Sequence, residues 1–218
     1  MIAGLLPSAV VAVEAFEDVP GEKPFPGEED LIAGAVEARR REFITSRRCA
    51  REALRVFGYL EEPIRPGAKR EPQWPAGITG SITHCVGYRA AAVARTADVS
   101  LLGIDAEPNS SLPADVAESV IVPGEVEMLS RLAGSHPDTC WERLLFSAKE
   151  SVYKAWFPVT RRWLGFEEVC LSIDADAGSF TAALLVEGTR IDGAPPLRSL
   201  HGRFVVDRGL VMTAVVSR

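Results

Sequence analysis

The order of helical and strand-like patterns is the feature that most restricts how this chain can fold. After a first apolar strand at 10–13, apolar residues recur at spacings of three, four and seven between residues 28 and 58, which predicts one long or two consecutive helices. Three short apolar segments follow, at 78–83, 88–94 and 100–105, and we expect them to form an antiparallel meander. The second half repeats this order, with helical patterns at 114–132 and 141–156 and strand patterns at 169–173, 180–186, 204–206 and 210–216. Helices followed by strands, twice, favour an α+β fold of two similar halves that meet near residue 103, here 1–103 and 104–218.

Length and charge exclude several classes of function. With 218 residues and 47% hydrophobic content, the chain can bury a sizeable core and is not a disordered tail. The formal net charge of -6 gives no overall field that attracts nucleic acid or an acidic membrane surface, so an anionic ligand must be held by a local patch. The four cysteines lack CxxC spacing, no apolar run approaches the ~20 residues of a membrane span, and the apolar N-terminus has no basic leader. We therefore expect a reduced, cytoplasmic protein that binds neither nucleic acid nor membranes.

Two carboxylates end the apolar segment Leu101–Glu107. Because side chains alternate along a strand, Asp105 and Glu107 point to the same face. Mg²⁺ typically takes one or two carboxylates and completes its octahedron with water and substrate phosphate, so this pair is a candidate magnesium site. The alternative is a pair of solvated loop residues, which is the commoner role of such acids.

The helical pattern at 141–156 carries two further candidates. Its apolar residues form one buried stripe and leave Glu150 and Lys154 four residues apart on a neighbouring face. One interpretation is a surface ion pair, which is frequent and worth only ~0.3–0.5 kcal/mol. The other makes Glu150 a third metal ligand and Lys154 a clamp for phosphate.

Basic and glycine-containing segments could supply the local patch for an anion. Six arginines crowd one helical region, at positions 39, 40, 41, 47, 48 and 51, either as a solvated face or as a bidentate grip on a phosphate ester. In the segment Gly77–Cys85, glycines allow the backbone to approach a phosphate, and Ser81, Thr83 and His84 could add donors. A lone histidine such as His84 is more often a structural residue.

Five segments, taken together and in order, are similar to one known family. They are Arg39–Ala50, Glu71–Pro75, Gly80–His84, Gly103–Glu107 and Phe146–Ala155, and the G-I-D plus F-S-x-K-E-x-x-x-K-A combination is the specific part. The chain resembles the phosphopantetheinyl transferase superfamily, in particular its larger monomeric branch that activates siderophore, nonribosomal peptide and polyketide synthases. The resemblance implies two pseudo-symmetric α/β halves, each with helices on a small, mostly antiparallel sheet, and coenzyme A lying across the cleft between them.

The resemblance also implies a reaction and residue roles. The 4'-phosphopantetheine group of coenzyme A would move to a serine of an apo acyl or peptidyl carrier protein, releasing adenosine 3',5'-bisphosphate. Asp105, Glu107 and Glu150 would hold Mg²⁺, which Mn²⁺ could replace, and Lys154 would contact the same phosphates. The N-terminal half would bind coenzyme A: its phosphates through Arg39, Arg47, Ser81 and His84, and its adenine near Lys69 and Glu71. Which arginine of the run 39–41 faces the ligand stays open, because sequence register does not fix a helix rotation.

Two alternatives remain beside this interpretation. Ser151 and Lys154 match the S-x-x-K of penicillin-binding acyl-enzymes, although the companion motifs S-D-N and K-T-G are missing. A non-catalytic module that binds coenzyme A or a carrier protein is the other, and the three acids argue against it, because without a metal they would repel a pyrophosphate. For catalysis, Glu150, directly or through a metal-bound water, is the candidate base for the serine proton. Chains of the small homotrimeric branch are roughly half as long, so we expect a monomer.

Overall fold

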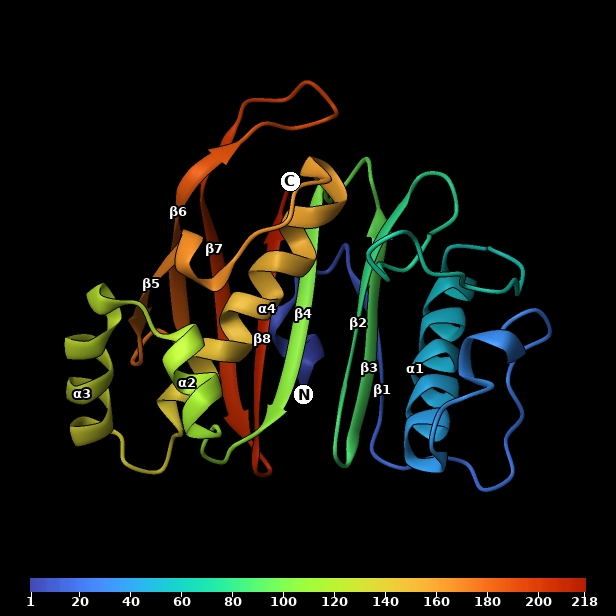
Figure 1. Cartoon of the computed structure of the whole chain (residues 1–218). Helices are drawn as coiled ribbons and strands as arrows, with labels where there is room; N and C mark the ends of the chain where they lie inside the picture. The colour runs from blue at the N-terminus through green and yellow to red at the C-terminus, as the bar shows by residue number, and fades with distance from the viewer.

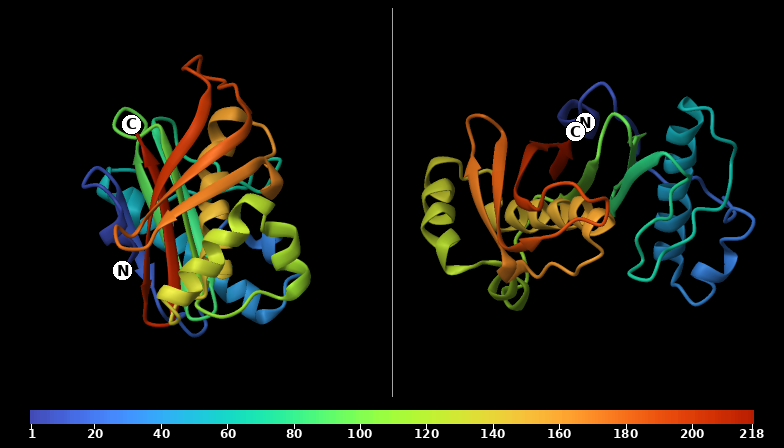
Figure 2. Two further views of the ribbon diagram at one scale, coloured as in Figure 1. Left: turned by 90° about the vertical axis from the view of Figure 1, so that its left-hand side faces the viewer. Right: turned by 90° about the horizontal axis from the view of Figure 1, so that it is seen from above.

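Both predicted long helices form, and each lies against an antiparallel sheet. The computed structural model describes all residues, 1–218. Helix α1 (Glu37–Val56) covers a sheet of order β1-β3-β2, and helix α4 (Trp141–Thr160) covers a sheet of order β4-β8-β7-β6-β5 (Figure 1). The strands are β1 (Val11–Ala15), β2 (Ile78–Cys85), β3 (Tyr88–Arg95), β4 (Leu101–Pro108), β5 (Val169–Asp174), β6 (Ser179–Gly188), β7 (Leu197–Asp207) and β8 (Leu210–Ser217). Seen from above, α1 lies at one end of the molecule and α3 at the other, with α4 between them (Figure 2). The predicted α+β fold is confirmed.

Glycine and proline shorten the predicted helices. In the first half, residues 28–36 contribute only a short 3-10 helix at Glu29–Ile32, and α1 begins at Glu37. Gly27 has a positive φ of 86° and Gly34 follows the turn, and glycine opposes helix because it keeps more backbone freedom than other residues. In the second half, Pro123 divides the predicted helix at 114–132 into α2 (Ala114–Val120), a 3-10 turn at Pro123–Glu125 and α3 (Val126–Ser135), because proline cannot donate the bond that continues a helix.

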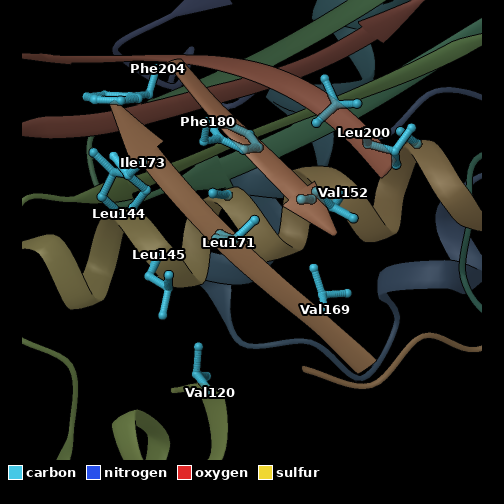
Figure 3. Packing of buried hydrophobic residues seen from close by; sticks show 14 of the residues in the cluster. Val120, Leu144, Leu145, Val152, Val169, Leu171, Ile173, Phe180, Leu200 and Phe204 are labelled. Atoms are coloured by element: carbon cyan, nitrogen blue, oxygen red, sulfur yellow. The ribbon is translucent and has the colours of Figure 1, made fainter. Parts of the chain in front are cut away.

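The apolar stripe predicted on α4 forms the centre of the larger core. Leu145, Ala148, Val152 and Ala155 are at most 1% exposed. Figure 3 shows Leu144, Leu145 and Val152 of the helix among side chains of the strands, including Leu171 of β5, Phe180 of β6 and Phe204 of β7. Each large apolar side chain buried in this way contributes about 1.5–3 kcal/mol, which fixes the rotation of α4 and therefore the direction of its polar face.

Helix α4 lies close against β4 at Gly103, the first residue of the G-I-D motif. A Cβ atom at Gly103 would lie 2.0 Å from the Ser151 backbone oxygen and 2.7 Å from the Ala155 nitrogen. Glycine therefore permits the backbone of α4 to rest directly on β4. This contact sets the distance between the strand that carries Asp105 and the helix that carries Glu150.

The predicted meander of three strands is wrong in its last strand. β2 and β3 form a hairpin, but β4 pairs along its whole length with β8, from Leu101 opposite Ser217 to Pro108 opposite Leu210. The partner of β4 lies about a hundred residues further along the chain, and local patterns carry no information on such pairing. The change from one sheet to the other falls in the connection 96–100, so the predicted boundary at residue 103 lies inside β4.

Hydroxyl groups join the two sheets where β2 and β4 lie side by side. The Ser81 Oγ accepts a hydrogen bond from the Ile104 N–H at 3.0 Å, and the Thr83 Oγ1 accepts one from the Ala106 N–H at 3.1 Å. Behind this seam, Tyr88 of β3, Leu102 of β4 and Met212 of β8 share one core with the N-terminal 3-10 helix at Ile2–Leu5. These hydrogen bonds and this shared core hold the two sheets edge to edge along β2 and β4. None of the helices combines the length and the apolar character needed to cross a bilayer.

Candidate active site

A cavity of about 510 Å³ opens along the seam, between α1 and β2 on one side and α4 on the other. Its lining includes every residue predicted to bind coenzyme A, together with Glu150: Arg39, Arg47, Lys69, Glu71, Ser81, His84 and Lys154. These positions span more than a hundred residues of sequence, from Arg39 to Lys154, and the fold brings them together.

Helix α1 contributes a cationic wall. Arg47 is 9% exposed, its guanidinium lies 4.0 Å above the Phe43 ring, and its Nε donates to the Ile64 carbonyl at 3.1 Å. Burial lowers the pKa of Arg47 to about 10, so the side chain stays charged at neutral pH. Arg39 also lines the cavity, whereas Arg40, which donates to the Ile32 carbonyl at 2.9 Å, and Arg41 do not. The structure thus brings Arg39, of the three consecutive arginines, into the cavity.

His84 stands beside this wall as a neutral group. Arg39 Nη1 lies 3.2 Å from its Nδ1 and in closer contact with its Nε2, and Glu42 Oε2 lies 3.4 Å from Nδ1. Burial, and then the charges of Arg39 and Lys154, lower the pKa of His84 to about 4. The imidazole can therefore meet a phosphate as a neutral donor, or take up a proton when an anion offsets the nearby cations. Ser81 is only 3% exposed and its hydroxyl is already engaged in the seam, so its role toward a ligand stays a prediction.

The loop that carries Lys69 and Glu71 is held across the cavity by the other half of the molecule. One oxygen of the Glu71 carboxylate accepts the Lys69 N–H at 2.9 Å, and the other lies 2.9 Å from Nη1 of Arg161, at the end of α4. The loop folds tightly around this carboxylate, since a Cβ at Gly67 would lie 2.2 Å from Glu71 Oε1. The two halves are thereby linked on both sides of the cavity, by the seam and by this ion pair.

Of the three predicted metal ligands, Glu150 lines the cavity on the α4 side, whereas Asp105 and Glu107 of β4 do not line it and are paired with cations of α4. Asp105 is 5% exposed and its Oδ1 lies 2.6 Å from Lys154 Nζ. Glu107 Oε2 lies 3.0 Å from Arg143 Nη1. Because both partners stand on α4, Asp105 and Glu107 face the same side of β4, as the strand period predicts. Burial raises the pKa of Glu150, and the charge of Asp105 raises it further against the opposing effect of Lys154.

Comparison with known proteins identifies the family. A model of the 4'-phosphopantetheinyl transferase N-terminal domain matches residues 27–94, and a model of the 4'-phosphopantetheinyl transferase superfamily matches residues 101–206. 4'-Phosphopantetheinyl transferase Svp of Streptomyces mobaraensis is 50% identical over 99% of this chain and 88% of its own length. The corresponding values for 4'-phosphopantetheinyl transferase PptT of Mycobacterium tuberculosis are 46%, 99% and 97%. The chain belongs to the 4'-phosphopantetheinyl transferase superfamily.

More distant relatives cover part of this transferase. Enterobactin synthase component D of Escherichia coli K12 is 39% identical over 54% of the chain and 54% of its own length. The gap between the two family-model matches, residues 95–100, includes the connection 96–100 that leads from one sheet to the other.

The donor set of the transferase fits a divalent cation. In the structure the three acids do not form a ready-made group of metal ligands, and Lys154 and Arg143 each occupy one oxygen, of Asp105 and Glu107 respectively. The second oxygen of Asp105, Oδ2, is buried and has no hydrogen-bond partner. An unpartnered buried carboxylate oxygen is costly, and a hard cation such as Mg²⁺ would satisfy it. The assignment of Asp105, Glu107 and Glu150 as its ligands stays a prediction.

Sequence reasoning missed several residues that shape this site. Lys149, inside the signature motif, is 2% exposed and donates to Glu125 Oε2 at 3.0 Å and to the Val120 and Phe166 carbonyls at 2.8 and 3.0 Å. Glu125 is itself fully buried and accepts the Leu171 N–H at 2.8 Å, so the pair ties α4 to the segments around it. A lysine next to an apolar stripe was the only available signal.

Three further residues lie closer to the acids. Thr83, which the sequence indicated as a possible donor to a phosphate, does not line the cavity, and its Oγ1 instead donates to Asp105 Oδ1 at 3.2 Å. Arg143 lies two helical turns before Glu150, and this spacing predicts that the two side chains share a face of the helix. The Tyr153 hydroxyl is buried beside the cavity without a hydrogen-bond partner, and no sequence pattern indicated it.

Proposed function

We propose that this transferase moves the 4'-phosphopantetheine group of coenzyme A to a serine of apo acyl and peptidyl carrier proteins, using the cavity at the seam. The observation that carries the proposal is the shared cavity itself. Its α1 and β2 side supplies Arg47, which has no ion-pair partner, and Arg39, which pairs with Glu42, while its α4 side supplies Glu150 and Lys154. Binding groups for a polyanion therefore lie within reach of a carboxylate of raised pKa.

The residues of the chain account for binding. Arg39, Arg47 and Lys154 would hold the phosphates, with His84 and Ser81 as neutral donors and Lys69 and Glu71 near the adenine. Mg²⁺, held by Asp105, Glu107 and Glu150, would offset the charge of the pyrophosphate when bound. Fixed cations in a partly desolvated cavity stabilise charge that develops during phosphoryl transfer more strongly than water does.

The chemical step needs one base and one leaving group. The serine oxygen forms a bond to the β-phosphorus, and the bond from that phosphorus to the oxygen of adenosine 3',5'-bisphosphate breaks, so its electron pair leaves with the nucleotide. The serine proton passes to the Glu150 carboxylate, directly or through a water, a role typically worth about 10²–10⁴-fold. Arg39 and Arg47 remain with the departing nucleotide and stabilise its new negative charge.

The alternative interpretations find less support. Ser151 is fully buried and its hydroxyl donates to the Ala148 carbonyl at 2.8 Å within α4, so it is not accessible as an acyl-enzyme nucleophile. A module that only binds coenzyme A would not need acids opposite the phosphate-binding wall. Both walls of the cavity come from one chain, which supports action as a monomer, and light scattering coupled to size exclusion would test it.

Intact-protein mass spectrometry tests the proposed reaction. The purified protein is incubated with an apo carrier protein, coenzyme A and Mg²⁺, beside a metal-free control. We expect the carrier to gain the mass of one phosphopantetheine only when metal is present. No gain across several acyl and peptidyl carriers, with coenzyme A still bound, would favour the binding module. A gain without metal would refute the assigned role of the three acids.

A further inference from the structure

Arg143 makes an unusually complete set of contacts with the segment that follows Asp105. It stands in the first turn of α4, and its side chain is 15% exposed. Its guanidinium donates to Glu107 Oε2 at 3.0 Å, to the Ser110 carbonyl at 3.0 Å and to the Ser111 carbonyl at 2.7 Å. All three acceptors lie within residues 107–111, so a single rigid fork fixes both the Glu107 carboxylate and the chain leaving β4.

The two cations that pair with the acids differ in character. Lys154 lines the cavity, and its amine is a point charge on a flexible stem that can turn toward an incoming phosphate. Arg143 does not line the cavity and is held by two backbone carbonyls. Lys154 can therefore exchange Asp105 for a ligand, whereas Arg143 stays with Glu107.

We propose that Arg143 is a positioning residue for Glu107, which it presents to the divalent cation as a ligand with one free oxygen. Glu107 Oε2 is occupied by the guanidinium, and Oε1 receives no hydrogen bond from the protein. The inference rests on the proposed metal site and adds a residue that stands behind it. Partners of this kind hold a ligand's rotamer, and their loss typically lowers metal affinity by about 10–100-fold.

Charge and orientation predict opposite results when Arg143 is removed. A cation next to a metal ligand repels the metal, so removal of a mere counter-ion would tighten metal binding. A positioning residue holds the ligand in place, so its removal would weaken metal binding. The sign of the change separates the two roles.

Mn²⁺ titration followed by electron paramagnetic resonance, with saturating coenzyme A and no carrier protein, measures this sign without turnover. We expect Arg143→Met to weaken Mn²⁺ binding by roughly tenfold or more, and Arg143→Lys, which keeps the charge but not the fork, to weaken it less. Arg131→Met, at an exposed position of α3, is the matched control and should leave Mn²⁺ affinity unchanged. In a Glu107→Gln background, Arg143→Met should add no further loss. In turnover assays, Arg143→Lys should raise the Mg²⁺ concentration for half-maximal rate while kcat at saturating Mg²⁺ stays near that of the parent.

Two results would overturn the inference. Unchanged or tighter Mn²⁺ binding by Arg143→Met would make Arg143 a counter-ion only. An equal loss with and without Glu107 would assign it a general structural role. Failure of the parent protein to bind Mn²⁺ at all would instead remove the proposed metal site, and this inference with it, while coenzyme A binding in the same sample would show that the cavity itself is intact.

Discussion

Helices α1 and α4 are equally long, 20 residues each, and each lies against one sheet, yet they use their charges differently. Of the two cavity arginines of α1, Arg47 rests on an aromatic ring and a carbonyl without an ion-pair partner, and Arg39 lies 3.4 Å from Glu42. The charged groups of α4 stand opposite carboxylates: Lys154 pairs with Asp105, and Arg143 with Glu107. One helix therefore presents two arginines to an anion in the cavity, and the other pairs its cations with the acids of β4.

This difference separates binding from chemistry. Changes to the cavity arginines of α1 should weaken coenzyme A binding with little effect on kcat, whereas changes to Glu150 of α4 or Asp105 of β4 should lower kcat at saturating coenzyme A. Separate measurements of the Kd for coenzyme A and of kcat in variants of each side test this assignment.

The largest expected effect is that of Glu150→Gln. This variant keeps the shape of the side chain but cannot accept the serine proton, so we expect kcat to fall by about 10²–10⁴-fold while coenzyme A still binds. Turnover by intact-protein mass spectrometry and coenzyme A binding by calorimetry measure the two quantities. Glu142→Gln, at an exposed position of the same helix, is the control. Near-normal turnover of Glu150→Gln would remove Glu150 as the base.

The next effect is that of Arg47→Ala on the opposite wall. Loss of a charge-assisted contact to phosphate, worth about 1.5–3 kcal/mol, should raise the Kd for coenzyme A by roughly 10–100-fold and change kcat by only a few-fold. Arg41→Ala provides the comparison, because Arg41 is half exposed on α1 and does not line the cavity. If Arg47→Ala instead lowered kcat at unchanged Kd, the assignment of binding to α1 and of the chemical step to the α4 side would be wrong.

The sequence was sufficient for features that depend on local period. Asp105 and Glu107 share a face because they are two residues apart on a strand, and the α4 stripe is buried because its apolar residues recur at helical spacing. The family resemblance then placed seven residues in one cavity. The rotation of α1 about its axis could not be predicted from the sequence, because Arg39, Arg40 and Arg41 are chemically identical and only packing determines which of them faces the cavity.

Gly103→Ala probes the contact between β4, which carries Asp105, and α4, which carries Glu150. The added Cβ would overlap the α4 backbone, which cannot yield as a flexible side chain would, so we expect a loss of about 1–3 kcal/mol in the free energy of unfolding. Turnover should also fall, because α4 moves relative to Asp105. Gly134→Ala, in α3 with no atom within 4 Å of the new Cβ, should instead leave stability equal or slightly higher. Urea titration compares the two variants, and equal behaviour would show that α4 and β4 adjust without cost.

Long-range pairing explains what the sequence could not provide. The partner of β4 is β8, and the buried partner of Lys149 is Glu125 in the 3-10 turn Pro123–Glu125, outside α4. Neither contact follows from a local pattern. The contacts of Arg143 with Glu107 and of Thr83 with Asp105 likewise join residues 36 and 22 positions apart in the sequence. The supporting groups of the site were therefore less predictable than the groups that would touch the ligand.

The last prediction concerns His84 and sharpens the account of the cationic wall, with an effect that is small at neutral pH and grows as the pH decreases. Its pKa is about 4 in the folded protein against an ordinary value of 6.5, so between these pH values the unfolded chain takes up a proton that the folded protein does not. The free energy of unfolding should therefore fall as the pH decreases from about 6.5 to about 4, by up to ~1.4 kcal/mol per pH unit from this group, and the contribution should be constant above pH 6.5. The raised pKa values of Glu107 and Glu150 act in the opposite direction, so the quantity to measure is the difference between the parent and His84→Gln. His201→Gln, at an exposed position of β7, is the control. Bound coenzyme A should reduce this difference in the free energy of unfolding between the parent and His84→Gln, because a phosphate beside Arg39 favours the protonated imidazole. If coenzyme A leaves the difference unchanged, its phosphates bind away from His84.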